Sequence, residues 1–166
     1  MAFKKNILVI ANVTATSDEL CRELTERARH EPIAFTILMP AGNHAADQSR
    51  LEAAVARLRG AGLDVEGEVG DRDPIVAVDE AWDPRRYDEI VVSTLPIGVS
   101  KWLHAGVPER ISKLTGALVT HTVSLPAKPP VENGPAPRHA DIGLGPLSVL
   151  GWGGRQEDTR QPRARS

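Results

Sequence analysis

Polar side chains follow two apolar runs that we interpret as buried strands, and these side chains could bind a small molecule. One group comes directly after the run Ile7–Ile10, and the other follows the run Glu89–Val92. Hydroxyl and amide groups both donate and accept hydrogen bonds, which suits the polar groups of a small ligand. The candidate residues for these hydrogen bonds are Asn12, Thr14, Ser93, Thr94, Gly98 and Ser100.

The second group belongs to a long connection between a strand and a helix. The strand pattern ends at Ser93, and the next helical pattern begins only at Val107. Connections between strands and helices in α/β proteins usually have a few residues, and a much longer one is usually functional. We therefore expect the segment Thr94–Gly106 to touch whatever the protein binds.

Each candidate also has a purely structural interpretation. Asn12 could only cap a turn, since its side chain tolerates turn geometry, and Ser93 and Thr94 could only satisfy loop amides. Lys101 is more often a solvated charge than a phosphate partner. The pair Trp102–Leu103 could lie in the core beneath the loop or at a dimer contact, and we favour the core.

The sequence carries no recognisable catalytic or metal-binding pattern. Its five histidines are scattered without metal-ligand spacing, and nucleophile-elbow and P-loop motifs are absent. His104 has no visible carboxylate or nucleophile partner, so we interpret it as a surface residue, and His121 as a sheet residue. The single cysteine, Cys21, lies on the apolar face of an expected helix and is interpreted as buried. We predict no catalytic residue, no metal site and no enzymatic activity.

Five strand patterns that alternate with helical patterns must position these residues. The expected strands are 6–11, 33–38, 63–70, 89–93 and 117–123, and the expected helices are about 17–28, 45–61, 74–82 and 107–114. Strands that alternate with single helices imply right-handed crossovers and a parallel sheet covered on both faces. We therefore predict an α/β fold with a flavodoxin-like or Rossmann-like, doubly wound, five-stranded parallel sheet.

Local signals mark several boundaries of these elements. Thr16 with Glu19 forms a capping-box pattern for the first helix, and Ser17 is the alternative cap. Asp73 is the expected cap of the third helix, with Pro74 at its first position. Apolar and polar residues alternate in the third strand, which predicts that one face of this strand is exposed to solvent and that the strand lies at an edge of the sheet.

Size, composition and charge indicate an ordinary globular domain. The chain has 166 residues, of which 41% are hydrophobic and 25% charged, enough for one core. Its net charge of -2 gives no indication of a nucleic-acid partner. No apolar run approaches the roughly 20 residues that span a bilayer, and the first residues lack a signal-peptide pattern. We expect no membrane association and a cytoplasmic location.

The last part of the chain differs in composition from the rest. Residues 125–166 hold seven of the thirteen prolines and six of the fourteen glycines, with few core-forming residues. Such a composition cannot bury enough apolar surface to offset the entropy lost on ordering. We predict a folded domain over residues 1–124 and a disordered tail, rich in proline, glycine and arginine, over residues 125–166.

Several of these segments resemble the universal stress protein (UspA-like) family. The resemblance covers about residues 5–123 and is carried by the order and spacing of four pieces. They are Ile7–Ile10 with its polar turn, Val69–Asp71 with Pro74, Tyr87–Ser93, and Gly106–Ile111. Ser-Thr-Leu-Pro and Trp-Leu in the fourth loop are similar to small actinobacterial relatives. The resemblance implies a strand order of 3-2-1-4-5 and a homodimer that pairs through the last strand.

The resemblance also implies a ligand, ATP or AMP, and a place for it. In a sheet of that order the exits of the first and fourth strands flank the switch point where ligands bind. The exit of the second strand would wall off one side and could contact an adenine ring. The implied site residues are Ala11, Asn12, Val13, Thr14, Met39, Pro40, Ser93, Thr94, Gly98, Ser100, Gly106 and Val107.

The chain departs from the family's nucleotide-binding pattern at several positions. Nucleotide-binding members carry an aspartate after the first strand, and here that position is Asn12. The three glycine positions after the fourth strand fall on Ser93, Pro96 and Gly106, and the final hydroxyl position falls on Val107. Glycine permits backbone amides to approach a phosphate closely, whereas proline removes an amide donor.

Three functional interpretations follow from these residues. We favour a non-catalytic regulatory or binding protein of the universal stress protein type with a degenerate nucleotide pocket. The first alternative is a genuine sensor that binds ATP or AMP. The second is a nucleotide-hydrolysing enzyme of the related adenine nucleotide α-hydrolase group, against which the missing glycine-rich loop and the missing acid–base pair argue.

Overall fold

Five strands form one parallel sheet with the expected topology. The computed structural model describes residues 3–41 and 44–126. The strands are β1 (Lys5–Ile10), β2 (Ile33–Pro40), β3 (Asp64–Gly70), β4 (Glu89–Thr94) and β5 (Leu118–Val123). They lie in the order β3-β2-β1-β4-β5, and every neighbouring pair is parallel. The predicted fold class, a doubly wound α/β sheet in the order 3-2-1-4-5, is confirmed.

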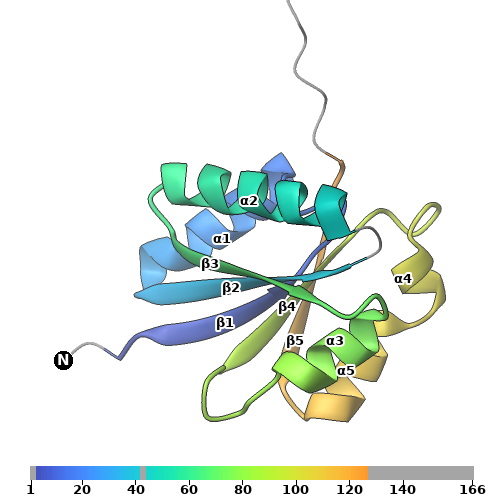
Figure 1. Ribbon diagram of the computed structural model, residues 1–166. Coiled ribbons are helices and arrows are strands. Elements are labelled where there is room, and N and C mark those ends of the chain that lie inside the picture. The colour runs from blue at the N-terminus through green and yellow to red at the C-terminus, as the bar shows by residue number, and fades with distance from the viewer. Residues whose placement is uncertain (1–2, 42–43, 127–166) are drawn as a thin grey trace, which may run out of the picture. The chain divides into compact units, whose positions relative to one another are not determined.

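Helices cover both faces of this sheet. They are α1 (Asp18–His30), α2 (His44–Gly60), α3 (Pro74–Ala81), α4 (Lys101–His104) and α5 (Val107–Thr115). Helices α1 and α2 lie on one face and α3 and α5 on the other, while α4 lies beside the carboxyl ends of the strands (Figure 1). Successive strand residues point to opposite faces. In β1, Ile7 and Val9 therefore pack with α1 and α2, whereas Leu8 and Ile10 pack with α3 and α5.

Two helices begin at capping residues that the sequence predicted, α1 at Ser17 and α3 at Asp73. Ser17, rather than Thr16, caps α1, because its hydroxyl accepts a hydrogen bond from the Leu20 amide. Glu19, the partner expected for Thr16, instead accepts from the amide of Leu125 at 3.3 Å. The expected cap of α3 is confirmed, since the Asp73 carboxylate accepts from the Ile75 amide and Pro74 follows it.

Two boundaries at the carboxyl edge differ from the expectation. The second strand, expected over residues 33–38, continues through Pro40, and the fourth, expected over residues 89–93, continues through Thr94. The connection predicted as an unbroken loop contains α4. Its single turn is capped by Ser100, whose hydroxyl accepts from the Leu103 amide at 3.2 Å. A short polar cap is a weak sequence signal, and four residues are too few for a helical periodicity.

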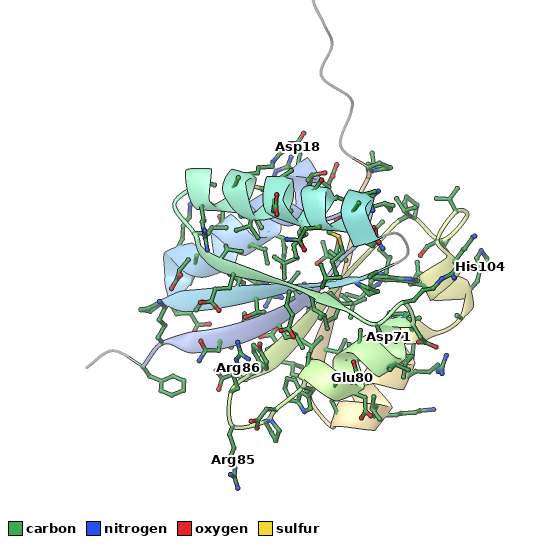
Figure 2. The ribbon with its side chains drawn as sticks, in the orientation of Figure 1. Asp18, Asp71, Glu80, Arg85, Arg86 and His104 are labelled. Carbon is green, nitrogen blue, oxygen red and sulfur yellow. The ribbon has the colours of Figure 1, made fainter. Side chains whose placement is uncertain are left out.

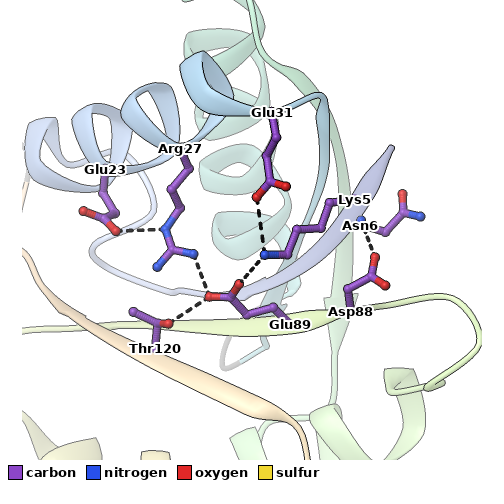
Figure 3. Close-up of polar contacts among 8 residues, drawn as sticks. All are labelled: Lys5, Asn6, Glu23, Arg27, Glu31, Asp88, Glu89 and Thr120. Carbon is purple, nitrogen blue, oxygen red and sulfur yellow. Dashed lines mark hydrogen bonds and ion pairs between the residues drawn. The ribbon is translucent and has the colours of Figure 1, made fainter. Parts of the chain in front are cut away.

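A buried carboxylate joins four elements at the amino edge of the sheet. Glu89, the first residue of β4, is 3% exposed. It accepts from Lys5 Nζ at 3.0 Å, from Arg27 Nη1 at 2.6 Å and from Thr120 Oγ1 at 2.8 Å (Figure 3). Arg27 is held in place by Glu23 as well, at 2.9 Å. We interpreted Glu89 only as part of an apolar run, because periodicity does not reveal a buried ion pair.

These contacts keep the buried groups charged. Burial raises the pKa of the Glu89 carboxyl, but the hydrogen bonds from Lys5, Arg27 and Thr120 outweigh burial and hold that pKa below its ordinary value. The hydrogen bond to Glu89 raises the pKa of Lys5, against the smaller effect of burial. The cluster lies at the start of β4, whereas the candidate site residues lie at and beyond the opposite, carboxyl ends of the strands. We therefore interpret the cluster as structural.

The expectations for the tail and for the cellular location are not tested by the structure. The predicted tail, residues 125–166, lies outside the described residues from residue 127 onward, and the domain boundary at residue 124 stays a prediction. Within the described ranges, none of the helices combines the length and the apolar character that a membrane span requires. The cytoplasmic location also stays a prediction.

Candidate functional site

A hollow lies beside the adjacent exits of β1 and β4. These two strands pair directly, and Thr14 Oγ1, just beyond the end of β1, donates to the carbonyl of Ser93 near the end of β4 at 3.2 Å. The hollow, called here the β1–β4 hollow, has a volume of about 300 Å³. It is lined by Asn12, Val13, Thr14, Ser93, Thr94, Leu95, Val99, Ser100, Lys101 and Trp102. Its volume is at the lower end of the range of small-molecule sites.

Three buried hydroxyl groups connect the ends of β1, β4 and β5. Ser93 Oγ lies 2.9 Å from Thr14 Oγ1 and 3.1 Å from Ser124 Oγ. All three residues are almost fully buried. Buried polar groups are normally satisfied in this way. The hydroxyls of Thr14 and Ser93 therefore hold the two exits together and have little hydrogen-bonding capacity left for a ligand.

The walls of the β1–β4 hollow are mainly apolar. Val13 and Val99 are exposed at its edge, and Leu95 and Trp102 are half-buried. Lys101 is exposed and, among the described residues, is the only charged residue in the lining. Such walls suit a flat, mainly apolar group, and the lysine suits a negative charge attached to it.

Both polar atoms of the Asn12 side-chain amide form hydrogen bonds within the protein. Its Nδ2 donates to the carbonyl of Pro40 at 2.8 Å, and its Oδ1 accepts from Arg50 Nη1 at 2.6 Å. The same Arg50 nitrogen lies 3.1 Å from Asp47 Oδ1. Asn12 therefore links the exits of β1 and β2 to α2, which goes beyond the turn cap that we considered for it.

Comparisons with known proteins rest on structure alone. No family model matches this chain, and no curated protein matches it. A solved universal stress protein in complex with cAMP is 20% identical, covers 75% of this chain and 100% of its own, and superposes with a TM-score of 0.56. The universal stress protein from Archaeoglobus fulgidus is 18% identical, covers 70% of this chain and 92% of its own, and has a TM-score of 0.53.

A further structure from Archaeoglobus fulgidus, in complex with dAMP, is 15% identical and has a TM-score of 0.53. It covers 73% of this chain and 98% of its own length. This chain has the universal stress protein fold.

Within the universal stress protein fold of this chain, Thr94 pairs with a histidine of the edge strand. Thr94 Oγ1 lies 2.7 Å from His121 Nε2 and 3.0 Å from the carbonyl oxygen of Leu95. The single Thr94 hydroxyl proton can go either to the carbonyl of Leu95 or to His121 Nε2, and the tautomer of His121 decides which. Among the described residues, no group of three or more His, Cys, Asp or Glu side chains could hold a metal ion.

Six of the twelve predicted site residues do not line the β1–β4 hollow. Ala11, Met39 and Pro40 are buried in the protein interior, and Val107 is buried against a second hollow that is described below. Gly98 is exposed. Gly106 precedes α5 with a φ of 61°, a left-handed conformation that glycine adopts readily. The structure therefore brings together the exits of β1 and β4 and places the other predicted residues around them.

Sequence reasoning missed several residues that shape this site. Arg50 contacts Asn12 from 38 positions away, and Ser124 contacts Ser93 from 31 positions away. No local pattern marks either residue, because each contact depends on how the strands and helices pack. Trp102, which we assigned to the core, is half-buried and packs against the core between the sheet and α5, and it also lines the hollow, which we did not expect of it.

Proposed function

We propose that this chain is a non-catalytic binding protein of the universal stress protein type whose ligand is an adenine mononucleotide such as AMP or ATP. The observation that carries the proposal is the hollow beside the paired strands β1 and β4. Ligands of open α/β sheets bind outside the carboxyl ends of the strands, where the strand order reverses. The cAMP and dAMP complexes of proteins with this fold support the adenine nucleotide class.

The proposed pocket is degenerate in its phosphate contacts. Ser93 and Pro96 stand at two glycine positions of the nucleotide-binding pattern. The Ser93 hydroxyl is engaged with Thr14 and Ser124, and Pro96 has no amide to donate. A backbone cradle for phosphate is therefore weakened. We expect the base and the sugar, against apolar walls such as Trp102, to supply most of the affinity within the β1–β4 hollow.

The pair of Thr94 and His121 does not suit nucleophilic catalysis. A catalytic base accepts the proton of an accessible nucleophile, whereas Thr94 is almost fully buried and its hydroxyl also lies within hydrogen-bond distance of the carbonyl of Leu95. The pair instead connects β4 to the edge strand β5. The runner-up function, nucleotide hydrolysis, predicts steady ATP turnover that His121→Ala abolishes, and such turnover would contradict the non-catalytic proposal.

Thermal unfolding with and without nucleotide tests the binding proposal. A ligand at a hundred times its dissociation constant adds about 2.7 kcal/mol to the free energy of unfolding. We expect AMP, cAMP or ATP at millimolar concentration to raise the melting temperature of the wild-type protein. No shift with any of the three would overturn the proposal.

A matched pair of variants locates the bound nucleotide. Val99 lines the hollow and is 65% exposed, so Val99→Trp should fill the hollow without disturbing the core. Ile97 is 73% exposed in the same loop but does not line the hollow, so Ile97→Trp is the control. We expect Val99→Trp to abolish the nucleotide-dependent shift and Ile97→Trp to keep it. Equal shifts in the two variants would place the nucleotide elsewhere.

We also propose that two copies pair through β5. In the part of the chain that the structure describes, this strand is hydrogen-bonded to β4 on one side only, and Leu118 and Val123 on it are 67% and 49% exposed. An exposed apolar edge strand is a template for pairing with another chain. Sedimentation should give a dimer for the wild type and a monomer for Val123→Lys, and a wild-type monomer at all concentrations would contradict the pairing.

A further inference from the structure

A second hollow adjoins the β1–β4 hollow and shares two of its lining residues, Lys101 and Trp102. Its volume is about 530 Å³, and it is more open to solvent. It is called here the cationic hollow and is lined by Asp71, Arg72, Asp73, Pro74, Lys101, Trp102, Ala105, Val107 and Arg110. Helix α4, which carries the two shared residues, therefore borders both hollows.

Three cations from three separate segments line the cationic hollow. Arg72 comes from the connection between β3 and α3, Lys101 from α4, and Arg110 from α5. All three are exposed. Within residues 3–41 and 44–126, none of them has a carboxylate within ion-pair distance, unlike Arg27 and Arg50. Their positive charges are therefore open to an anion that enters the hollow.

The two carboxylates in the lining are partly committed to the backbone. Asp71 Oδ1 accepts from the Asp73 amide at 2.8 Å, and Asp73 Oδ1 accepts from the Ile75 amide at 2.8 Å. Figure 2 shows Asp71 at the start of α3, with His104 pointing away from the sheet on α4. The lining therefore contains three cations and two carboxylates, and both carboxylates already accept hydrogen bonds from backbone amides at the turn into α3.

We infer that the cationic hollow binds the phosphate chain of the nucleotide whose base lies in the β1–β4 hollow. This inference rests on the proposed function. Arginine forms paired hydrogen bonds with phosphate oxygens, and lysine supplies a point charge. Arg72, Lys101 and Arg110 thereby take the role that a backbone cradle would fill if Ser93 and Pro96 were glycines. The ligand class is a nucleotide with several phosphates.

Titrations that differ only in the number of phosphates test this assignment. Adenosine, AMP, ATP and inorganic triphosphate are titrated by calorimetry at fixed ionic strength into the wild type, Arg72→Gln and Arg110→Gln. The control is Arg85→Gln, which removes the same charge from an exposed arginine that points into solvent beyond α3 (Figure 2). All three arginines are exposed, so each variant should fold.

The expected result is a loss confined to phosphate. ATP should bind the wild type more tightly than adenosine, and Arg72→Gln and Arg110→Gln should each weaken ATP about tenfold, which is about 1.4 kcal/mol. Adenosine affinity should not change in either variant, and Arg85→Gln should bind ATP like the wild type. The ratio of ATP affinity to adenosine affinity should also decrease at high salt, because the contacts between the phosphates and the cations are charged and exposed to solvent.

The failure of the inference is distinguishable from the failure of the proposed function. Equal affinities for adenosine and ATP, or equal losses in Arg85→Gln, would overturn the phosphate assignment and leave nucleotide binding intact. If no nucleoside or nucleotide binds, the proposed function fails. In that case, triphosphate binding that Arg72→Gln and Arg110→Gln weaken would keep the cationic hollow as an anion site, and its absence would overturn both.

Discussion

Arg27 Nη1 lies 2.6 Å from Glu89 Oε1, in a place where Glu89 is almost fully buried. The pair joins α1 to the first residue of β4, and Lys5 and Thr120 complete it from β1 and β5. Removing one partner of a buried pair leaves the other charge uncompensated, which costs far more than an exposed pair contributes. This cluster therefore secures the edge of the sheet opposite to the two hollows.

Glu89→Gln should destabilise the protein strongly. We expect the free energy of unfolding to fall by about 3 kcal/mol, because Lys5 and Arg27 lose the carboxylate that balances their charges. Urea unfolding monitored by circular dichroism measures the loss. Glu26→Gln is the control, since it removes an exposed partner of Arg29 and should cost less than about 0.5 kcal/mol. Equal decreases in the free energy of unfolding of the two variants would show that the buried ion pairs of Glu89 stabilise the protein no more than an exposed ion pair does.

The same carboxylate predicts a pH dependence of stability. Its pKa is lower in the folded protein than its ordinary value of 4.5. A group of this kind adds stability that is fully present above the unfolded pKa and is lost as the pH falls through the folded pKa. Unfolding in urea from pH 7 to pH 3 should show wild-type stability falling below about pH 4.5. The gap between wild type and Glu89→Gln should narrow over the same range, and a constant gap would contradict the assignment.

Trp102 should report ligand binding by fluorescence, because it lines both hollows. Trp82 stacks on Tyr87 with ring centroids 6.1 Å apart and lines neither hollow. In a background with Trp82→Phe and Trp152→Phe, adenine nucleotides should change the emission of the remaining tryptophan. The converse variant, Trp102→Phe alone, should give no response. A response that persists in Trp102→Phe would place the ligand away from α4.

Ser124→Ala should separate structure from binding at the junction of β1, β4 and β5. Ser124 contacts Ser93 Oγ at 3.1 Å but does not line the β1–β4 hollow. The loss of one buried hydrogen bond should lower the free energy of unfolding by about 1 kcal/mol. Nucleotide affinity should stay at the wild-type value in calorimetry. A lost affinity with unchanged stability would mean that this hydroxyl reaches the ligand.

Much of the fold could be predicted from the sequence because its signals are local. Runs of apolar residues mark β1 and β4, and caps such as Asp73 depend only on residues two or three positions away. The predicted neighbours β1 and β4 then brought Asn12 and Ser93 to one edge of the sheet. The hollow between these exits is consistent with that expectation, while the binding role of its residues stays a proposal.

The sequence by itself determined the chain order of the strands and of the four longer helices and the parallel sheet, and it pointed to the edge of the sheet at which we propose that a ligand enters. Only the tertiary structure decided which polar groups are free. The Ser93 hydroxyl contacts Thr14 and Ser124, Asn12 is held by Arg50, and Arg72 and Arg110 line one hollow together with α4. The physical reason is that periodicity and capping act within one element. Side-chain partners across elements depend on strand register and helix packing, which no short stretch of residues encodes.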